Sequence, residues 1–305
     1  MADHAVDDND GDNNVFIYRG GRAPQHITHA LIDRSLDEIE DYAFNRCQNL
    51  LTVETHDGLR KIGRFAFGNC RSLRRINIKS IVEIDESAFH NCALNSVEFG
   101  DRLEKIGGAA FSVCSSLTNL KLPFITTIGD YAFTTCASLI GIEFSERLEK
   151  IGGGAFWDCK RLQRIAVPLR RDLFEFSAAL RKYNQFDDCE QLTTVDLIGG
   201  IDKTVASLHM ESWTTEMVTE IDRINQVLPN TPADDKTDAI RQWIDSVIDK
   251  LDHYKAEHRS NVKEGITLLE LALWKARLDE REDDAVEGKT KKAKVDTVLQ
   301  GRRDR

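Results

Sequence analysis

Apolar positions recur through the first two thirds of this chain with a period of 22 or 23 residues. Cysteines mark the period at steps of 23, 22, 22, 22, 23 and 30 residues, at Cys47, Cys70, Cys92, Cys114, Cys136, Cys159 and Cys189. A phenylalanine stands three residues before each of them, at Phe44, Phe67, Phe89, Phe111, Phe133, Phe156 and Phe186. A fixed period of this length is typical of a stacked repeat whose units share one continuous core.

A short alternating segment follows each cysteine and predicts a strand. Segments such as SLTNLKL and SLIGIEF place apolar residues on one side and polar residues on the other. Stacking the repeats then makes a parallel sheet with two outward columns. These columns are Thr52, Arg75, Ser96, Asn119, Gly141, Arg164, Thr194 and Glu54, Asn77, Glu98, Lys121, Glu143, Ala166, Asp196.

The segment before each cysteine follows the pattern IGxxAFxxC, which we interpret as a helical turn. Its alanine recurs in the first six repeats at Ala43, Ala66, Ala88, Ala110, Ala132 and Ala155. A glycine recurs at Gly63, Gly107, Gly129 and Gly152, with Asp85 in its place in the third repeat. Because glycine and aspartate both tolerate left-handed backbone, we expect a tight turn at this position.

These repeats resemble the BspA-type leucine-rich repeat, with the consensus LxxIxLPxxxxxIGxxAFxxC. The pattern stands as LTNLKLPFITTIGDYAFTTC at 117–136 and RRINIKSIVEIDESAFHNC at 74–92, and the resemblance covers about 36–200. The whole chain also resembles the leucine-rich repeat proteins common in diatoms, for example in FIYRGGRAPQHITHALIDRSL and IRQWIDSVIDKLDHYKAEH. The resemblance implies a leucine-rich repeat solenoid of about seven repeats and a role in protein interaction. It implies no particular activity.

The solenoid is expected at 39–200, between a cap at 15–38 and a helical region at 201–280. The acidic residues 1–14 lack apolar periodicity and are expected to be disordered. The seventh repeat lacks the isoleucine and the alanine. Residues 168–185 insert before Phe186, and we interpret them as a loop or short helix.

Beyond Gly200 the apolar spacing becomes helical and predicts three amphipathic helices. The first stripe is Trp213, Met217, Ile221, Ile224 and Leu228. The second is Ile240, Trp243, Ile244, Val247, Ile248, Leu251 and Tyr254. The third is Val262, Ile266, Leu269, Leu273 and Trp274, and Ser260 could cap that helix. We expect a small bundle, which either caps the solenoid or contacts another chain; the oligomeric state stays open.

Residues 281–305 are first acidic and then basic and are expected to form a flexible charged tail. Their KTKKAK stretch is a weak candidate for a nuclear import signal. The N-terminus has no basic and apolar leader, so we expect a cytoplasmic protein, with a nuclear location as the alternative.

The composition limits the classes of partner that can be expected. The net charge is −10, which argues against nucleic acid or an anionic membrane, since both favour a basic surface. The chain contains no apolar run of about 18 residues, so no membrane span is expected. A protein or peptide partner remains.

Each residue pattern that could indicate chemistry also has a structural interpretation. The seven recurring cysteines include no CxxC pair, which is the spacing that typically holds zinc. We expect their thiols to be buried and reduced and to make weak hydrogen bonds. IGGGAFWDC at 151–159 contains glycines but neither GxxxxGK[ST] nor GxGxxG. We therefore expect no catalytic residues, no metal and no cofactor.

The outward sheet face is the remaining candidate, because solenoid faces provide extended binding surfaces. The candidate partner-binding residues are Thr52, Glu54, Arg75, Asn77, Glu98, Asn119, Lys121, Glu143, Trp157, Arg164 and Asp196. Trp157 is included because other repeats have Gly68, His90, Ser112 or Thr134 in its place, and we expect it to face outward. The function expected is a non-enzymatic interaction scaffold. The alternative is a surface adhesion protein, which the missing leader disfavours.

Overall fold

The computed structural model describes residues 15–95, 97–174, 183–206, 208 and 210–300, without the side chains of 201–203, 276 and 278–300. The chain divides into two compact units, residues 1–250 and residues 251–305. The acidic segment at 1–14 and the centre of the expected insertion, residues 175–182, lie outside the described residues.

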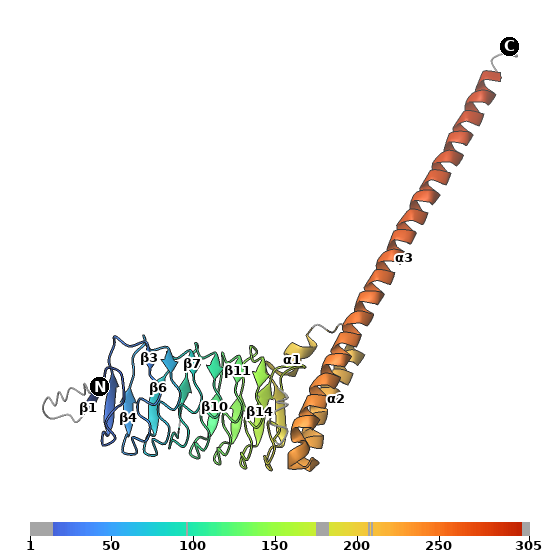
Figure 1. The fold of residues 1–305 in the computed structure, drawn as a ribbon. Helices are drawn as coiled ribbons and strands as arrows, with labels where there is room; N and C mark the ends of the chain where they lie inside the picture. The colour runs from blue at the N-terminus through green and yellow to red at the C-terminus, as the bar shows by residue number, and fades with distance from the viewer. Residues whose placement is uncertain (1–14, 96, 175–182, 207, 209, 301–305) are drawn as a thin grey trace. The chain divides into compact units, whose positions relative to one another are not determined.

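One face of the first unit is built of parallel strands, and it confirms the predicted sheet (Figure 1). The strands pair in the orders β1-β2-β4-β6-β8 and β10-β12-β14-β15. Their register aligns Thr52 with Arg75, and Asn119 with Gly141 and Arg164. The strands are β1 (Val15–Tyr18), β2 (His29–Ile32), β4 (Thr52–Glu54), β6 (Arg75–Ile78), β8 (Glu98–Phe99), β10 (Asn119–Lys121), β12 (Gly141–Glu143), β14 (Arg164–Val167) and β15 (Thr194–Leu197).

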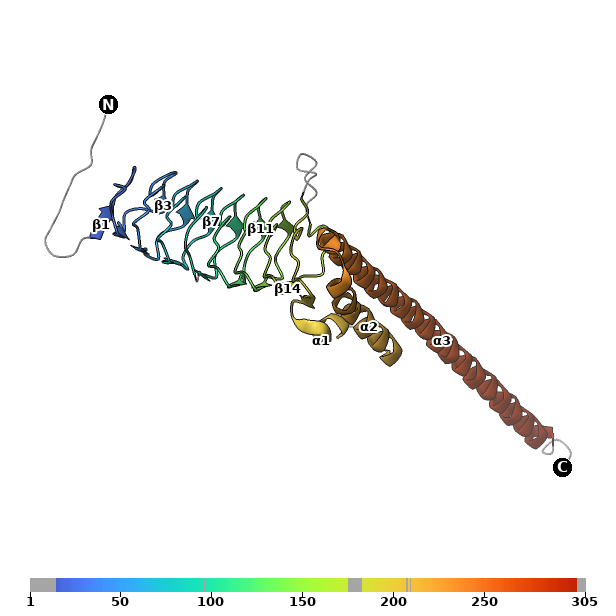
Figure 2. The same cartoon turned by 90° about the horizontal axis from the view of Figure 1, so that it is seen from below.

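A second parallel sheet, which the sequence did not predict, carries the isoleucine of each IGxxAFxxC segment. Its strands are two residues long and pair in the order β13-β11-β9-β7-β5-β3. Each isoleucine is buried, and the preceding residue is polar or charged. The strands are β3 (Glu38–Ile39), β5 (Lys61–Ile62), β7 (Glu83–Ile84), β9 (Lys105–Ile106), β11 (Thr127–Ile128) and β13 (Lys150–Ile151). Figure 2 shows the repeats following one another in chain order.

The IGxxAFxxC segment is a turn and not the expected helical turn. Two residues in each copy have left-handed backbone; in the first copy these are Tyr42 and Arg46, with φ of 62° and 67°. Backbone N–H groups of Tyr42, Phe44 and Arg46 donate to carbonyls of the next repeat, at 2.8, 2.7 and 2.7 Å. A helix would use these donors within the segment, but here the neighbouring repeat supplies the acceptors.

The recurring glycine serves close packing between repeats, so the expected left-handed turn at this position is wrong. Gly107, Gly129 and Gly152 have no left-handed φ. A Cβ on Gly129 would lie 2.8 Å from the backbone carbon of Gly107, and one on Gly152 would lie 2.7 Å from that of Gly129. Such contacts are shorter than real Cβ atoms make, so only glycine fits without a backbone shift.

The core contains a ladder of phenylalanine rings. All seven are fully buried, and neighbouring ring centroids lie 5.0 to 5.5 Å apart in near-parallel planes. Tyr18 ends the ladder beyond Phe44, with its ring centroid 4.9 Å away. The missing isoleucine of the seventh repeat is replaced by Phe174, which is buried and bridges to Ile151. The insertion therefore continues the core at this point.

Helices close the last repeat (Figures 1 and 2). They are α1 (Gly200–Val205), α2 (Glu211–Val227), the short 3-10 helices η1 (Leu228–Asn230) and η2 (Ala233–Asp235), and the start of α3 (Lys236–Gln300), of which residues 236–250 belong to the first unit. The first predicted stripe is buried in α2 and η1, and Ile240, Trp243, Ile244 and Val247 are buried at the start of α3. These helices cover apolar surface that the final repeat would otherwise expose.

Specific hydrogen bonds also satisfy the backbone of the last repeat. Lys236 is 2 % exposed, and its Nζ donates to the carbonyls of Cys189, Glu190 and Leu192 at 3.0, 2.8 and 2.7 Å. The N–H of Val195 donates to Oδ1 of Asn225 at 2.8 Å. An unpaired strand edge is a site for unwanted pairing, and Asn225 satisfies one N–H of the edge strand β15, while Lys236 satisfies the turn that leads into it.

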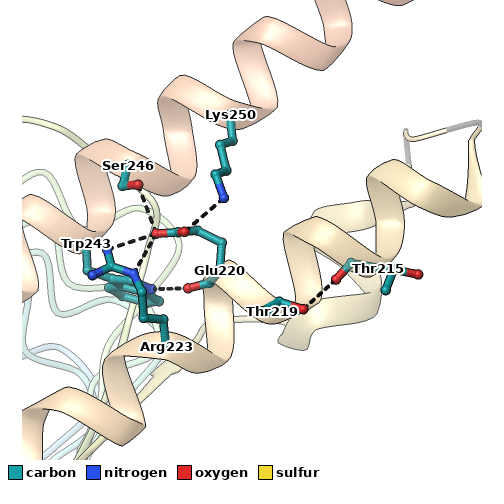
Figure 3. A network of polar contacts seen from close by, with 7 residues as sticks. All are labelled: Thr215, Thr219, Glu220, Arg223, Trp243, Ser246 and Lys250. Atoms are coloured by element: carbon teal, nitrogen blue, oxygen red, sulfur yellow. Dashed lines mark hydrogen bonds and ion pairs between the residues drawn. The ribbon is translucent and has the colours of Figure 1, made fainter.

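A buried carboxylate joins α2 to the first turns of α3 (Figure 3). Glu220 accepts hydrogen bonds from Arg223, Ser246 and Lys250 at 3.0, 2.9 and 3.0 Å, and its carbonyl accepts from Trp243 Nε1 at 3.1 Å. Burial raises the pKa of Glu220, but the hydrogen bonds from Lys250, Ser246 and Arg223 outweigh this effect, and the pKa is lowered. The carboxylate therefore stays charged and holds the two helices together.

The third predicted helix does not exist as a separate element. α3 is continuous from Lys236 to Gln300, so Ser260 lies inside it and caps nothing. The third stripe does not pack into a bundle either, because Val262, Ile266, Leu269, Leu273 and Trp274 are between 45 % and 66 % exposed. The helix also includes residues assigned above to the charged tail. Periodicity identified the helix but could not show whether its apolar face has a partner.

Candidate binding surface on the outward sheet face

The predicted sheet-face residues lie on the outward side of successive strands in two aligned columns. Asn77 pairs in register with Glu98, Lys121 with Glu143, and Arg164 with Thr194. The inward neighbours are buried, so each strand presents only its polar side to solvent. The exposed residues are Thr52, Glu54, Arg75, Asn77, Glu98, Asn119, Lys121, Glu143 and Arg164, and Asp196 is half-buried.

Ion pairs between adjacent repeats occupy much of this surface. Lys121 Nζ lies 3.1 Å from the carboxylate of Glu143, and Lys79 Nζ lies 2.6 Å from that of Glu98. Arg164 pairs with Asp196. The hydrogen bond from Lys79 lowers the pKa of Glu98, and the hydrogen bond to Asp196 raises the pKa of Arg164. These charges stabilise one another along the stack, although exposed pairs of this kind contribute little stability.

The N-terminal end of the face is different. Glu54 and Arg75 are exposed and have no ion-pair partner among the described residues. Beside them β1 and β2 expose apolar side chains: Val15 and Ile17 are each 43 % exposed and Leu31 is 37 % exposed. Val15 aligns with His29 and then Thr52, and Ile17 aligns with Leu31 and then Glu54, so the patch continues the two columns.

The cap expected at 15–38 does not predict this patch, because it leaves the two sides of VFIY and HALI undistinguished. Strand alternation is the signal that separates their two sides. Tyr18, Ala30 and Ile32 point inward and are buried, whereas Val15, Ile17 and Leu31 point outward. We call Val15, Ile17, Leu31, Glu54 and Arg75 the N-terminal patch.

Trp157 does not belong to the sheet face. It lies in the turn segment of the sixth repeat and is half-buried. Its Nε1 donates to Asp188 Oδ2 at 2.7 Å, and its ring centroid lies 4.4 Å from that of Tyr183. The structure therefore separates Trp157 from the other candidate residues. Its contacts with Asp188 and Tyr183 account for the position of its side chain without a binding partner.

The thiols have a structural role. All seven cysteines are free and buried. Each of the last six donates from Sγ to the carbonyl of a phenylalanine one repeat earlier, at 3.0 to 3.3 Å. Burial raises the pKa of Cys47 to about 11 and that of Cys114 and Cys159 to about 12. A thiol nucleophile needs the opposite shift and some exposure.

Two other kinds of feature are absent from the described residues. No three or more histidine, cysteine, aspartate or glutamate side chains there come together as possible metal ligands. Nor does any helix in that part of the chain have the length and apolarity to cross a bilayer.

Comparison with known proteins identifies the repeats. The family model described as the BspA type leucine rich repeat region matches residues 24–92 and 82–203, in 6 copies. A leucine rich repeat protein from T. pallidum is 26 % identical, with 60 % of this chain and 74 % of that chain covered and a TM-score of 0.39.

A leucine-rich repeat protein from Bacteroides ovatus is 23 % identical, with 56 % of this chain and 61 % of that chain covered and a TM-score of 0.37. The pneumococcal vaccine antigen PcpA is 17 % identical, with 64 % and 39 % covered and a TM-score of 0.31. No curated protein matches this chain.

Proposed function

We propose, from the premise that this chain belongs to the BspA type leucine rich repeat family, that it is a non-enzymatic scaffold which binds a protein or peptide. The observation that carries the proposal is the contrast between the two sides of the strands. Inward residues are apolar and buried in each repeat, whereas outward residues are exposed or half-buried and differ from repeat to repeat. A surface whose residues vary on a constant frame suits recognition.

The N-terminal patch is the part of this face that best fits a partner. Protein interfaces combine an apolar centre with a polar rim. Val15, Ile17 and Leu31 would supply the apolar centre, and Glu54 and Arg75 would supply charges of both signs at the rim. Farther along the face, Lys121 and Arg164 already have carboxylate partners. We therefore propose a partner with an apolar side chain flanked by charges complementary to Glu54 and Arg75.

The same proposal assigns no catalysis to the chain. Buried thiols with raised pKa values support that assignment, since a nucleophile needs an accessible thiolate. We also propose a reducing compartment such as the cytoplasm, because seven free thiols suit one. The basic KTKKAK stretch lies where side chains are not described, and a nuclear location stays the alternative.

Site-specific photocrosslinking tests the binding surface. A photoreactive residue at position 75 in the N-terminal patch is expected to capture a discrete partner from native extract. The same residue at Lys105, in the second sheet, serves as the matched control. A double variant, Leu31→Glu with Arg75→Glu, is expected to lose that partner, while Lys105→Glu keeps it. The proposal fails if both crosslinking positions capture the same proteins or if the double variant binds as the natural chain does.

Removing the helices would be a poor test of the sheet face. A chain ending near residue 205 lacks Lys236 and Asn225, which satisfy backbone groups of the last repeat. It also exposes the apolar surface that α2 covers. Substitutions on exposed residues avoid this damage and are therefore preferred.

A further inference from the structure

The part of α3 in the second unit carries an apolar surface without a described partner. Seven apolar side chains between residues 262 and 274 are 45 % to 66 % exposed. They are Val262, Ile266, Leu268, Leu269, Leu271, Leu273 and Trp274. Exposed apolar surface of this extent marks an interaction site.

Four of these residues form a seam on one side of the helix. Val262, Ile266, Leu269 and Leu273 follow one another at spacings of 4, 3 and 4 residues, which is the spacing of a coiled-coil seam. Leu268, Leu271 and Trp274 lie on the other side of the same helix. The seam therefore covers about three turns of helix, and the remaining apolar residues lie outside it.

Small residues flank the seam on one side. Gly265 and Ala272 are one heptad apart and lie on the same edge of the seam. Glycine in a helix interior is destabilising relative to alanine. A Cβ on Gly265 would meet nothing within 4 Å, so no contact within the described chain requires a glycine. The glycine is explained if another backbone approaches this edge closely.

Opposite charges flank the seam on its other side. Lys263 and Glu270 are also one heptad apart, and among the described residues neither has an ion-pair partner. In an antiparallel pair of helices, residues at this edge of one helix face the same edge of the other. In a parallel pair they face the opposite edge, which here holds Gly265 and Ala272.

We propose that a second copy of this chain pairs with α3 along this seam in antiparallel orientation. The register that places Val262 against Leu273 of the second copy also places Ile266 against its Leu269. It then brings Lys263 beside Glu270 and Gly265 beside Ala272, each twice by symmetry. The seam, the glycine and the charges thus all agree on one arrangement. This self-association is independent of the binding function proposed for the sheet face.

Mass measurement of the full chain by light scattering tests the pairing. At tens of micromolar the natural chain is expected at twice its 34.5 kDa mass. Leu269→Glu in the seam is expected to give a single-chain mass, whereas Leu271→Glu, the matched control outside the seam, keeps the dimer. Because both leucines are exposed, circular dichroism should show unchanged folding. A single-chain mass for the natural protein, or dissociation by Leu271→Glu alone, overturns the proposal.

Charge reversal tests the orientation. Lys263→Glu and Glu270→Lys each turn two attractive pairs into repulsive ones, and each is expected to weaken the dimer roughly tenfold. The double variant restores both pairs and is expected to recover the natural dissociation constant. If the single variants leave the constant unchanged, or if the double variant is weaker than either, the antiparallel register is wrong.

Discussion

At the scale of the residue, identical positions in the repeat serve packing between neighbouring repeats. Gly129 is flanked so closely by the Gly107 backbone that no side chain fits. The left-handed positions are instead taken by residues such as Tyr42 and Arg46, at about 1–2 kcal/mol each relative to ordinary backbone. Their N–H groups bond to the next repeat, which offsets that cost. Sequence repetition identified these positions. Only the short distance between neighbouring repeats explained why they hold a glycine or a left-handed residue.

Gly129→Ala is therefore expected to destabilise the solenoid by about 1–3 kcal/mol, since its Cβ forces a backbone shift. Gly141→Ala is the control, because its Cβ would meet the flexible Asn119 side chain at 3.2 Å and the Arg164 carbonyl at 3.7 Å, which is ordinary contact. Its effect is expected within about 0.5 kcal/mol. Urea unfolding followed by circular dichroism measures both. Equal effects would contradict the role given to Gly129.

The buried thiols predict a dependence of stability on pH. Their folded pKa values are raised by burial, for example to about 11 for Cys47 and about 12 for Cys114. Above about pH 9 the unfolded chain loses thiol protons that the folded chain keeps. The unfolded state then binds fewer protons, so the free energy of unfolding falls as pH rises from 8 to 10. Urea midpoints at these two pH values measure the change; a flat or rising midpoint would contradict it.

At the scale of the element, the helices differ in how much of their apolar surface is covered. α2 and the start of α3 bury their stripes and satisfy the last repeat, with Lys236 at the centre of three hydrogen bonds. Burial removes Lys236 from water and lowers its pKa. The stripe at 262–274 has the same periodicity and remains exposed. Hydrophobic spacing alone does not distinguish these cases.

Lys236→Met is expected to destabilise the first unit by about 2–3 kcal/mol, because three carbonyls, two of them buried, lose a charged donor. Lys250→Met serves as its control, since that lysine is partly exposed and pairs with Glu220 alone. It is expected to cost at most about 1 kcal/mol. Thermal unfolding monitored by near-ultraviolet circular dichroism compares the two. A larger effect from Lys250→Met would show that the cap depends on the Glu220 network instead.

At the scale of the whole molecule, the solenoid is stabilised mainly between adjacent repeats. The phenylalanine ladder makes each ring depend on its two neighbours, as Phe111 does on Phe89 and Phe133. Stability in such a stack is a sum of repeat and interface contributions, so damage in the centre separates the two ends.

Phe111→Ala is expected to cost about 3–5 kcal/mol and to divide unfolding into two transitions. Phe65→Ala is its control, because that ring is half-buried in a turn and stacks on Tyr42 outside the ladder. We expect it to keep a single transition. Calorimetry distinguishes the outcomes, and a single transition for Phe111→Ala would argue against nearest-neighbour stabilisation.

The sequence by itself determined the repeat, its register, the inward core and the outward columns of the sheet. It could do so because stacking forces the same residue into the same environment in every copy, and the period records that environment. Only the tertiary structure decided the second sheet, the reason for the glycines, the place of Trp157 and the ends of the solenoid. These depend on which backbone or side chain lies across from a residue, as Lys236 lies across from the Leu192 carbonyl. The period marks the isoleucines and glycines but does not say which backbone lies across from them, and a single contact such as that of Lys236 leaves no period at all.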